Sequence, residues 1–368
     1  MAGSTYGTIF KITTWGESHG RGIGVVIDGC PAGLPLSEED IQLYLNRRKP
    51  GQSKYTTKRA ENDRIEVLSG TFHGVTTGTP ISLLVFNEDQ HSKDYGNLAS
   101  CYRPGHADYT FQNKYGIRDY RGGGRSSGRE TIGRVAAGAI ASKLLKEMGI
   151  EILTYTKSIG PISIPSNQYC YSDISCNPLY MPNNSYAKQA EEYLNSCIHN
   201  LDSAGGIVEC VVKNMPIGIG EPVFEKLDAN LAKAILSIGA VKGFEIGDGF
   251  SAASSKGSTN NDCFCNDNGT LTKKSNHSGG VLGGMSDGCD LIFRAAFKPT
   301  PSIAQPQQTV TEDGNNTELI IHGRHDPIIV PRAVVVVEAM TALTLADMLL
   351  LNMSARMDKI TEFYKHDK

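Results

Sequence analysis

Two stretches of the sequence are rich in arginine and lysine, without the regular acidic partners of a salt-bridged helix surface. The first spans residues 47–59, and the second spans residues 103–134, where arginine is mixed with glycine, serine and tyrosine. The basic residues of interest are Arg47, Arg48, Lys49, Lys54, Lys58, Arg59, Arg103, Arg118, Arg121, Arg125, Arg129 and Arg134. Guanidinium groups suit bidentate binding of phosphate and carboxylate, so both stretches are candidates for holding a small polyanion. A solvated basic surface is the alternative interpretation.

Within the second stretch, residues 122–131 read GGGRSSGRET and resemble a phosphate-binding loop. Glycines and small hydroxyl residues lead into a predicted helix, whose first turn offers free amide donors. The segment is not a Walker A motif, because no Lys-Ser or Lys-Thr pair follows the required glycine. No clear strand precedes it, which argues against a dinucleotide-binding fingerprint. A tight turn without a ligand explains the segment equally well.

Three titratable residues lie in loops marked by glycine or proline, where catalytic groups concentrate. They are His19 in GESHG, His106 in RPGHAD and Asp326 in GRHDP. Imidazole suits proton transfer near neutral pH, although a single histidine of this kind is more often a structural residue. None of the three has metal-ligand spacing, so we expect no metal site.

The composition argues against several classes of protein. The chain has 368 residues and a formal net charge of -3, which gives no overall attraction to nucleic acid or anionic membrane. Its nine cysteines are scattered and odd in number, which suits a reducing compartment better than a disulfide framework. The first residues lack the pattern of a signal peptide, so we expect a cytoplasmic protein. Residues 333–353 are apolar enough to suggest a membrane span, but Glu338 and Asp347 favour a core helix.

Sequence periodicity and turn residues predict mixed helices and strands in one continuous domain, residues 1–368. Strands are expected at Tyr6–Thr13, Gly22–Asp28, Arg64–Phe72, Pro80–Phe86, Gly206–Met215, Val241–Ile246, Asp290–Phe297 and Glu318–His322. Helices are expected from Ser37 to about Arg47, from Arg129 to Met148, and at Ala187–Ile198 and Ala229–Ile238. Residues 103–128 are expected to be a loop, and the polar residues 250–276 a long mobile loop or lid.

Several motifs together resemble the chorismate synthase family, in order along nearly the whole chain. They are GESHG at 16–20, RRKPGQS at 47–53, RPGHAD at 103–108, GRSSGRET with RVAAG at 124–138, EIGDGF at 245–250, KPT at 298–300, and RHDP at 324–327 leading to Glu338-Ala339. Each motif is moderately specific, and the whole set is very specific.

The resemblance implies a fold, a reaction and partners. The fold would be α+β, a β-α-β sandwich with long helices packed between antiparallel sheets, assembled as a homotetramer. The reaction would be the elimination of phosphate from 5-enolpyruvylshikimate-3-phosphate to give chorismate, with reduced FMN (FMNH2) as cofactor. No flavin reductase domain is visible, so an external flavin reductase or another source of reduced flavin is expected. The resemblance also associates the chain with NADP, with no nucleic-acid or membrane partner.

The resemblance also implies roles for individual residues. His19 would protonate the departing phosphate, and His106 would donate a proton to the reduced flavin. Asp326, with Ser18 and Ser127, would assist loss of the C6 proton by way of flavin N5. The substrate would be held by Arg48, Lys54, Arg129 and Arg134. The flavin site would be lined by Arg125, Ser126, Ser127, Gly239, Ala240, Gly283, Lys298, Pro299, Thr300, Pro301, Ser302 and Arg324.

Three positions depart from the family pattern, and two other functions stay open. Lys54 stands where many members have arginine, Gly239 where asparagine or glutamine is common, and Pro301 where serine is common. These departures put individual contacts in question rather than the reaction. A phosphate-handling transferase without flavin would show no flavin colour after reconstitution. A non-enzymatic RNA- or anion-binding protein would show steep salt-dependent binding to nucleic acid.

Overall fold

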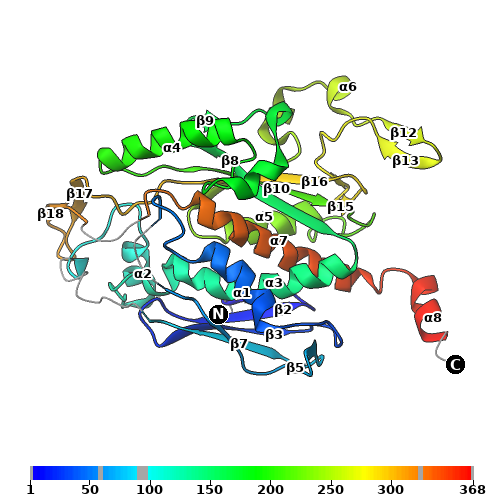
Figure 1. The fold of residues 1–368 in the computed structure, drawn as a ribbon, viewed down its shortest axis with the longest axis horizontal. Helices are drawn as coiled ribbons and strands as arrows, with labels where there is room; N and C mark the ends of the chain where they lie inside the picture. The colour runs from blue at the N-terminus through cyan, green and yellow to red at the C-terminus, as the bar shows by residue number, and fades with distance from the viewer. Residues whose placement is uncertain (1–2, 57–60, 89–97, 322–325, 366–368) are drawn as a thin grey trace.

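The computed structural model describes residues 3–56, 61–88, 98–321 and 326–365, and its main framework is a pair of five-stranded antiparallel sheets. In spatial order, the first sheet holds β1 (Thr5–Tyr6), β2 (Lys11–Gly16), β3 (Gly22–Asp28), β7 (Ile81–Phe86) and β4 (Ile65–Val67). The second holds β11 (Val241–Ile246), β16 (Leu291–Phe297), β10 (Gly206–Lys213), β8 (Glu151–Ile159) and β9 (Ile162–Ser163). Figure 1 shows helices lying between the two sheets.

The helices and short hairpins complete the described chain. The α-helices are α1 (Glu38–Arg48), α2 (Asp108–Tyr115), α3 (Thr131–Glu147), α4 (Asn184–His199), α5 (Leu227–Leu236), α6 (Gly257–Asn260), α7 (Val330–Asn352) and α8 (Met357–Lys365). The 3-10 turns are η2 (Gly124–Ser126), η3 (Gly128–Glu130), η4 (Ser166–Gln168), η5 (Tyr171–Cys176) and η6 (Gly249–Ser254). The hairpins are β5 (Thr71–Phe72) with β6 (Val75–Thr76), β12 (Phe264–Asp267) with β13 (Thr270–Lys273), β14 (Val281–Leu282) with β15 (Met285–Ser286), and β17 (Gln307–Val310) with β18 (Asn316–Leu319).

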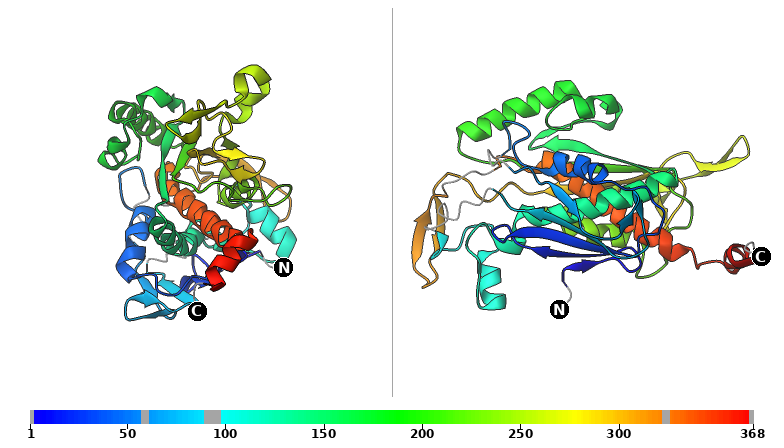
Figure 2. Two further views of the ribbon diagram at one scale, coloured as in Figure 1. Left: turned by 90° about the vertical axis from the view of Figure 1, so that its right-hand side faces the viewer. Right: turned by 60° about the horizontal axis from the view of Figure 1, so that its bottom comes forward.

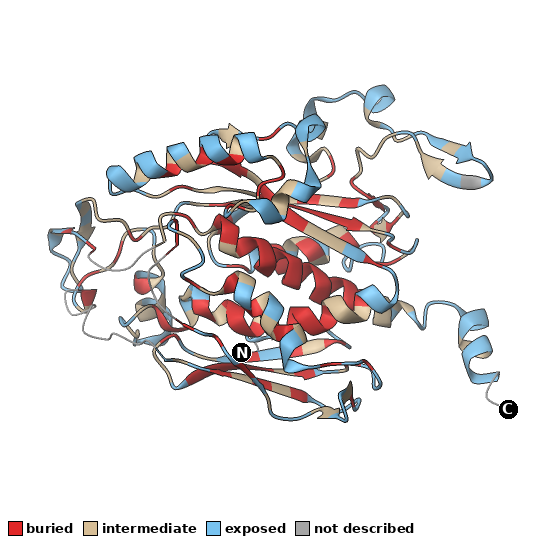
Figure 3. Ribbon diagram, in the orientation of Figure 1, coloured by how far each residue is buried: buried red, intermediate tan, exposed pale blue. Residues whose placement is uncertain are grey.

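Helix α7 is the centre of the main hydrophobic core. Its residues 330–348 are almost all buried, and Figure 3 shows α3 and α7 as the most buried helices. A Cβ atom at Gly138 of α3 would overlap Ala339 of α7, so the two helices cross with their backbones nearly in contact. Strand β16 alternates strictly between buried and half-buried residues, which directs one face of its sheet toward these helices. The core includes residues from both sheets.

Helix α1 places the first basic stretch at the edge of this core. Ser37 caps its start, with Asp40 completing a capping box, and Ile41 and Leu45 are fully buried. Arg47 and Arg48 therefore stand in its last turn, beside the start of α3. Basic side chains at that end also complement the helix dipole.

The structure confirms the coarse fold class, mixed helices and antiparallel strands. The predicted core helix at 333–353 is confirmed as the buried α7, which is the one helix of the described residues long and apolar enough to cross a membrane. The predicted strand at 22–28 and the predicted strand at 241–246 match β3 and β11 residue for residue. The single-domain expectation stays a prediction.

Several predicted elements were wrong in extent. Tyr6–Thr13 is not one strand, because Gly7 takes a positive φ of 90° and turns the chain between β1 and β2. Arg64–Phe72 divides into β4 and β5, the predicted loop at 103–128 contains α2, and strand β8 was not predicted. The predicted strand Glu318–His322 overlaps β18 only at its first two residues, because β18 ends at Leu319. The last residue of the predicted strand, His322, lies outside the described residues.

The polar segment 250–276 is not an irregular loop, because it contains most of η6 and all of α6, β12 and β13. Lys273 holds it to the body: its Nζ lies 3.3 Å from an oxygen of Asp262 and 2.6 Å from an oxygen of Asp287. All three side chains are almost completely buried. A buried ion-pair cluster therefore fixes the base of the β12–β13 hairpin, while its mobility stays a prediction.

Candidate active site

Two histidines meet at the run of glycines that leads into α3. Ser18 and His19 lie in the loop between β2 and β3, with Ser18 Oγ 3.2 Å from His19 Nδ1. A Cβ atom at Gly122 would overlap the His19 ring, and one at Gly123 would lie 2.9 Å from His106 Cε1. The glycine backbone thus touches both imidazoles, and a side chain at either glycine would displace a ring. The structure brings these two candidate residues together; their roles stay predictions.

A buried carboxylate that the sequence analysis did not single out stands behind His106. Asp108 accepts hydrogen bonds from Arg103 Nε (2.8 Å) and Nη2 (2.7 Å), and it lies 3.4 Å from His106 Nδ1. Burial alone would raise the pKa of Asp108, but the hydrogen bonds from Arg103, with the His106 ring nearby, hold it well below its usual range. Asp108 therefore stays ionised and can orient the His106 ring. The signal in the sequence is its place two residues after that histidine.

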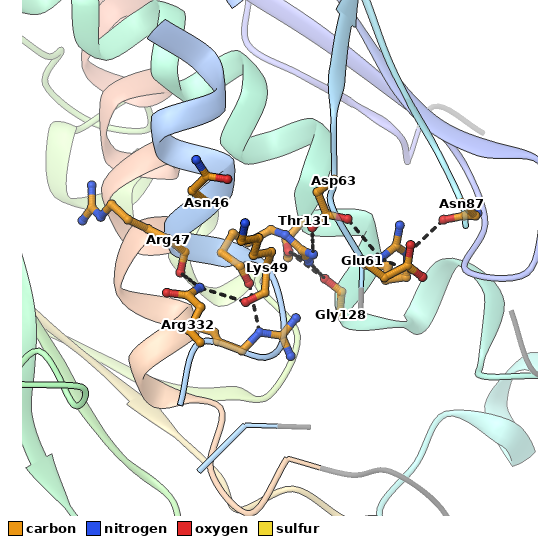
Figure 4. Close-up of polar contacts among 12 residues, drawn as sticks. Asn46, Arg47, Lys49, Glu61, Asp63, Asn87, Gly128, Thr131 and Arg332 are labelled. Atoms are coloured by element: carbon orange, nitrogen blue, oxygen red, sulfur yellow. Dashed lines mark hydrogen bonds and ion pairs between the residues drawn. The ribbon is translucent and has the colours of Figure 1, made fainter. Parts of the chain in front are cut away.

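A second carboxylate that sequence reasoning missed joins two of the candidate arginines (Figure 4). Asp63 lies 2.5 Å from Arg48 Nη2 and 3.2 Å from Arg129 Nη1, and Glu61 lies 3.4 Å from the same Arg129 nitrogen. Burial would raise the pKa of Asp63, but the Arg48 and Arg129 charges hold it below its ordinary value. Burial lowers the pKa of Arg48 to about 10, against the opposing effect of the Asp63 charge. The two guanidinium groups are held side by side near the start of α3.

Asp326 is connected to this arginine cluster through Arg332 in the first turn of α7. Arg332 Nη1 lies 2.5 Å from Asp326 Oδ2, and Arg332 Nε donates to the backbone carbonyl of Arg48 at 2.9 Å. The predicted flavin residue Arg324 lies outside the described residues. Arg332 therefore links a predicted catalytic carboxylate to the end of α1.

A cleft of about 330 Å³ opens beside the cluster. It is lined by Arg47, Gln52, Ser53, Thr56, Ser175, Cys176, Asn177, Pro178, Tyr180, Pro331 and Arg332. Arg47 is held on one side of it by Glu338, through hydrogen bonds of 3.1 and 2.6 Å. Polar and cationic groups therefore face a space large enough for part of a small molecule.

The comparisons with known proteins identify the family. The sequence model of the family described as chorismate synthase matches residues 10–350. The chain is 66% identical over 365 residues to a chorismate synthase of Agathobacter rectalis, covering 99% of this chain and 100% of that protein. The chain belongs to the chorismate synthase family. A chorismate synthase of Lachnoclostridium phytofermentans is also 66% identical, over 366 residues and with the same coverage.

A solved structure agrees with this assignment. The crystal structure of a chorismate synthase matches with a TM-score of 0.77 and 31% identity over 98% of both chains. The expected reaction, loss of phosphate to give chorismate, is therefore confirmed as the activity of the family to which the chain belongs.

Several residues predicted to line a flavin site lie around the glycine run. Arg125 Nη2 lies 2.7 Å from Thr14 Oγ1, and Arg125 Nη1 donates to the Gly16 carbonyl at 3.1 Å. Ser126 Oγ donates to the Gly123 carbonyl at 2.7 Å, whereas Ser127 Oγ caps η3 by accepting from Arg129 N. These contacts fix η2 and η3 against the loop that carries His19.

The segment after β16 brings further candidate residues to the loop that carries His106. The backbone N–H of Lys298 donates to the Ala240 carbonyl at 3.0 Å, and Lys298 Nζ donates to the Gly105 carbonyl at 2.6 Å. Burial, with a smaller effect of Lys242, lowers the pKa of Lys298. Pro299, Thr300, Pro301 and Ser302 follow directly along the chain, and a Cβ atom at Gly105 would lie 3.1 Å from Pro301 Cβ. This segment therefore runs beside the loop that carries His106.

Other predicted site residues, Gly239, Gly283, Lys54 and Arg134, make their contacts away from the glycine run. Gly283 precedes Gly284, whose carbonyl accepts from Leu227 at the start of α5, whereas Gly239 and Ala240 follow the end of that helix. Lys54 is exposed and lies over the Tyr55 ring at 4.9 Å. Arg134 bonds Glu130 and, at 2.6 Å, Ser237 Oγ near the end of α5. The structure does not bring Gly283 or Lys54 to the Arg48 cluster.

Proposed function

We propose that the active site for the elimination of phosphate from 5-enolpyruvylshikimate-3-phosphate lies where the end of α1 and the starts of α3 and α7 meet. The observation that supports it most strongly is the pair of guanidinium groups held by Asp63, next to two histidines separated by Gly122 and Gly123. A substrate with one phosphate and two carboxylates needs several fixed cations. Charge-assisted hydrogen bonds to such groups contribute roughly 1.5–3 kcal/mol each.

The substrate contacts in this proposal come from Arg48, Arg129 and Arg134, with Lys54 as an outer cation. Arg48 and Arg129 are almost completely buried, so they set the orientation and potential of the site rather than forming an exposed basic surface. Arg134 belongs to α3 but bonds Ser237 at the end of α5, and Lys54 is exposed. These two side chains would therefore contact the ligand from the rim of the site. Lysine in place of the usual arginine supplies charge without a bidentate contact.

The residues present fit a reduced FMN cofactor. Thr300 Oγ1 is buried without a hydrogen-bond partner among the described residues, and a Cβ atom at Gly239 would meet open space. Arg125 and Lys298 supply positive charge on either side of the glycine run. Reduced FMN, when bound, supplies the electron-rich chemistry that side chains lack, with no net redox change. Arg125, Ser126, Ser127, Ala240 and the segment 298–302 would hold it, with Gly239, Gly283 and Arg324 as further candidates.

The proton-handling roles belong to this chain's own side chains. His19 donates a proton to the departing phosphate, and a positioned acid of this kind contributes typically 10²–10⁴-fold. His106, oriented by the ionised Asp108, acts as the proton donor toward the flavin. Asp326, held by Arg332, assists loss of the C6 proton together with Ser18 and Ser127.

The surrounding organisation is part of the same proposal. The two sheets with helices between them correspond to a β-α-β sandwich in a single domain, and the assembly is a homotetramer. The protein works in the cytoplasm, with reduced flavin supplied by an external reductase. The association with NADP stays a prediction, and so does the absence of a metal. Among the described residues, no three metal-ligating side chains come together.

An anaerobic assay with photoreduced FMN tests the function directly. Wild-type protein and 5-enolpyruvylshikimate-3-phosphate are mixed, and phosphate and chorismate are measured. The expected result is stoichiometric phosphate and chorismate with reduced FMN, and neither product with oxidised FMN. Phosphate release at the same rate without any flavin would overturn the proposal in favour of a different phosphate-handling enzyme.

A further inference from the structure

One half-buried amide joins the loop of His19 to the arginine cluster. Asn87 directly follows β7, and its Nδ2 donates to the carbonyls of Glu17 at 3.0 Å and Gly20 at 2.8 Å. Its Oδ1 accepts from Arg129 Nε at 2.9 Å (Figure 4). Its backbone N–H donates to the Arg21 carbonyl at 3.1 Å.

These contacts close the loop that carries Ser18 and His19 at both of its ends. The loop has one internal backbone bond, from Gly20 N to the Glu17 carbonyl at 3.1 Å. The two Nδ2 bonds bind the same turn to the end of β7. Since Arg129 is itself fixed by Asp63, the Asn87 carboxamide connects the position of the His19 loop directly to that of the arginine cluster.

We infer that Asn87 is a positioning residue for the elimination, holding the His19 loop and the Arg129 guanidinium in one geometry. This inference rests on the proposed function. Only a carboxamide suits the place, because one end must donate to two carbonyls while the other accepts from a cation. Turning the amide over would direct its NH2 at the guanidinium and its oxygen at the carbonyls.

Two substitutions separate the two halves of this role. Asn87→Asp keeps an acceptor for Arg129 but loses both donors and places an oxygen against the Glu17 and Gly20 carbonyls. Asn87→Ala removes the contacts to both sides. The matched control is Asn276→Asp near the β12–β13 hairpin. Asn276 Nδ2 likewise donates to a carbonyl, of Asp290, and its Oδ1 lies 3.4 Å from the cation of Lys273.

Steady-state kinetics with saturating reduced FMN give the first measurement. For Asn87→Asp we expect kcat to fall about tenfold or more with KM within about twofold, since a tenfold change corresponds to the loss of one net hydrogen bond in the transition state. For Asn87→Ala we expect a similar loss in kcat and an additional rise in KM. Asn276→Asp should leave both constants unchanged. Equal losses in the Asn87 and Asn276 variants, or a changed KM alone in Asn87→Asp, would overturn the inference.

A double-mutant cycle separates positioning from general destabilisation. In the His19→Ala background, Asn87→Asp should have no further effect on kcat, because the group that it positions is gone. Full multiplication of the two losses would overturn the role.

Amide hydrogen exchange across residues 17–20 needs neither substrate nor flavin. Exchange should be faster in both Asn87 variants and unchanged in Asn276→Asp, and unchanged exchange in the Asn87 variants would count against the inference. This measurement does not depend on turnover. It therefore tests whether Asn87 holds the His19 loop even if wild-type protein releases no phosphate and the proposed function fails.

Discussion

The site end of the molecule and the β12–β13 end each bury charged side chains, but they satisfy them differently. Lys273 bonds Asp262, Asp287 and Ser278, the last two at 2.6 and 2.8 Å. At the site end, Arg48 is 1% exposed, and its Nε has no hydrogen-bond partner among the described residues. A cluster that only holds the fold can satisfy every donor, whereas a cluster that serves a ligand keeps hydrogen-bonding capacity in reserve. The difference indicates where stability and where activity should respond to substitution.

The sharpest form of this comparison uses two histidines. His106 lies 3.4 Å from Asp108 at the site end, and His277 lies 2.7 Å from Asp248 near the hairpin. We expect His106→Ala to lower kcat by roughly 10²–10⁴-fold, as for a lost acid catalyst, with the fold intact. His277→Ala should leave kcat within about twofold, the scale of a surface substitution. Anaerobic turnover with excess reduced FMN is the measurement, and near-normal kcat for His106→Ala would refute its role.

The hairpin cluster should show the reverse pattern. Lys273→Met leaves Asp262 and Asp287 buried without their cation, which typically costs about 3–5 kcal/mol in the free energy of unfolding. The kcat of the fraction that remains folded should not change. Urea unfolding followed by circular dichroism, together with activity per folded molecule, tests this. A large loss of specific activity in Lys273→Met would contradict the view that the hairpin cluster serves stability and the site cluster serves activity.

A smaller effect is expected when the buried carboxylate that holds the cations at each end, Asp63 or Asp262, is replaced by an amide. Asp63→Asn should raise KM for the substrate and lower kcat/KM by about 10- to 100-fold, since Arg48 and Arg129 lose their fixed orientation (about 1.4–2.8 kcal/mol). Asp262→Asn should lower stability without raising KM. Initial rates over a range of substrate concentrations separate the two. A lower KM in Asp63→Asn would mean that Asp63 competes with the substrate for the arginines instead of orienting them.

Acid should weaken both ends in the same direction. The pKa values of Asp63, Asp108 and Asp262 are held below the ordinary value by arginine charges or by hydrogen bonds, against the effect of burial. Each carboxylate therefore contributes stability that is present above its unfolded pKa of about 3.9 and is lost as pH falls toward its folded value. Urea midpoints should be level from about pH 5 to 7 and should fall below about pH 4. The fall should be shallower in Asp262→Asn, and an unchanged slope would contradict the assignment.

The sequence predicted the elements whose local chemistry is strong. The capped helix α1, the apolar α7 and strand β3 each carry their own signal, in a capping box or in a long apolar run. The residues of the glycine run and both histidines could be singled out because loops of this composition are unusual. Asp63, Asn87 and Arg332 could not, because nothing near them in the chain reveals a partner that lies dozens or hundreds of positions away: Arg332, for example, bonds the Arg48 carbonyl across 284 positions. Among these, Asp63 contacts Arg129 across 66 positions and Asn87 contacts Arg129 across 42.

The contact of Gly138 with Ala339 has a mechanical consequence. Only the Ala339 methyl group stands at the crossing of α3 and α7, so the two backbones are in close contact there and leave no room for a larger side chain. Arg129, just before α3, and Arg332, in the first turn of α7, both lie on the same side of this crossing. Because this contact is so tight, we expect the two helices to act as a stiff frame that keeps Arg129 and Arg332 at a constant separation.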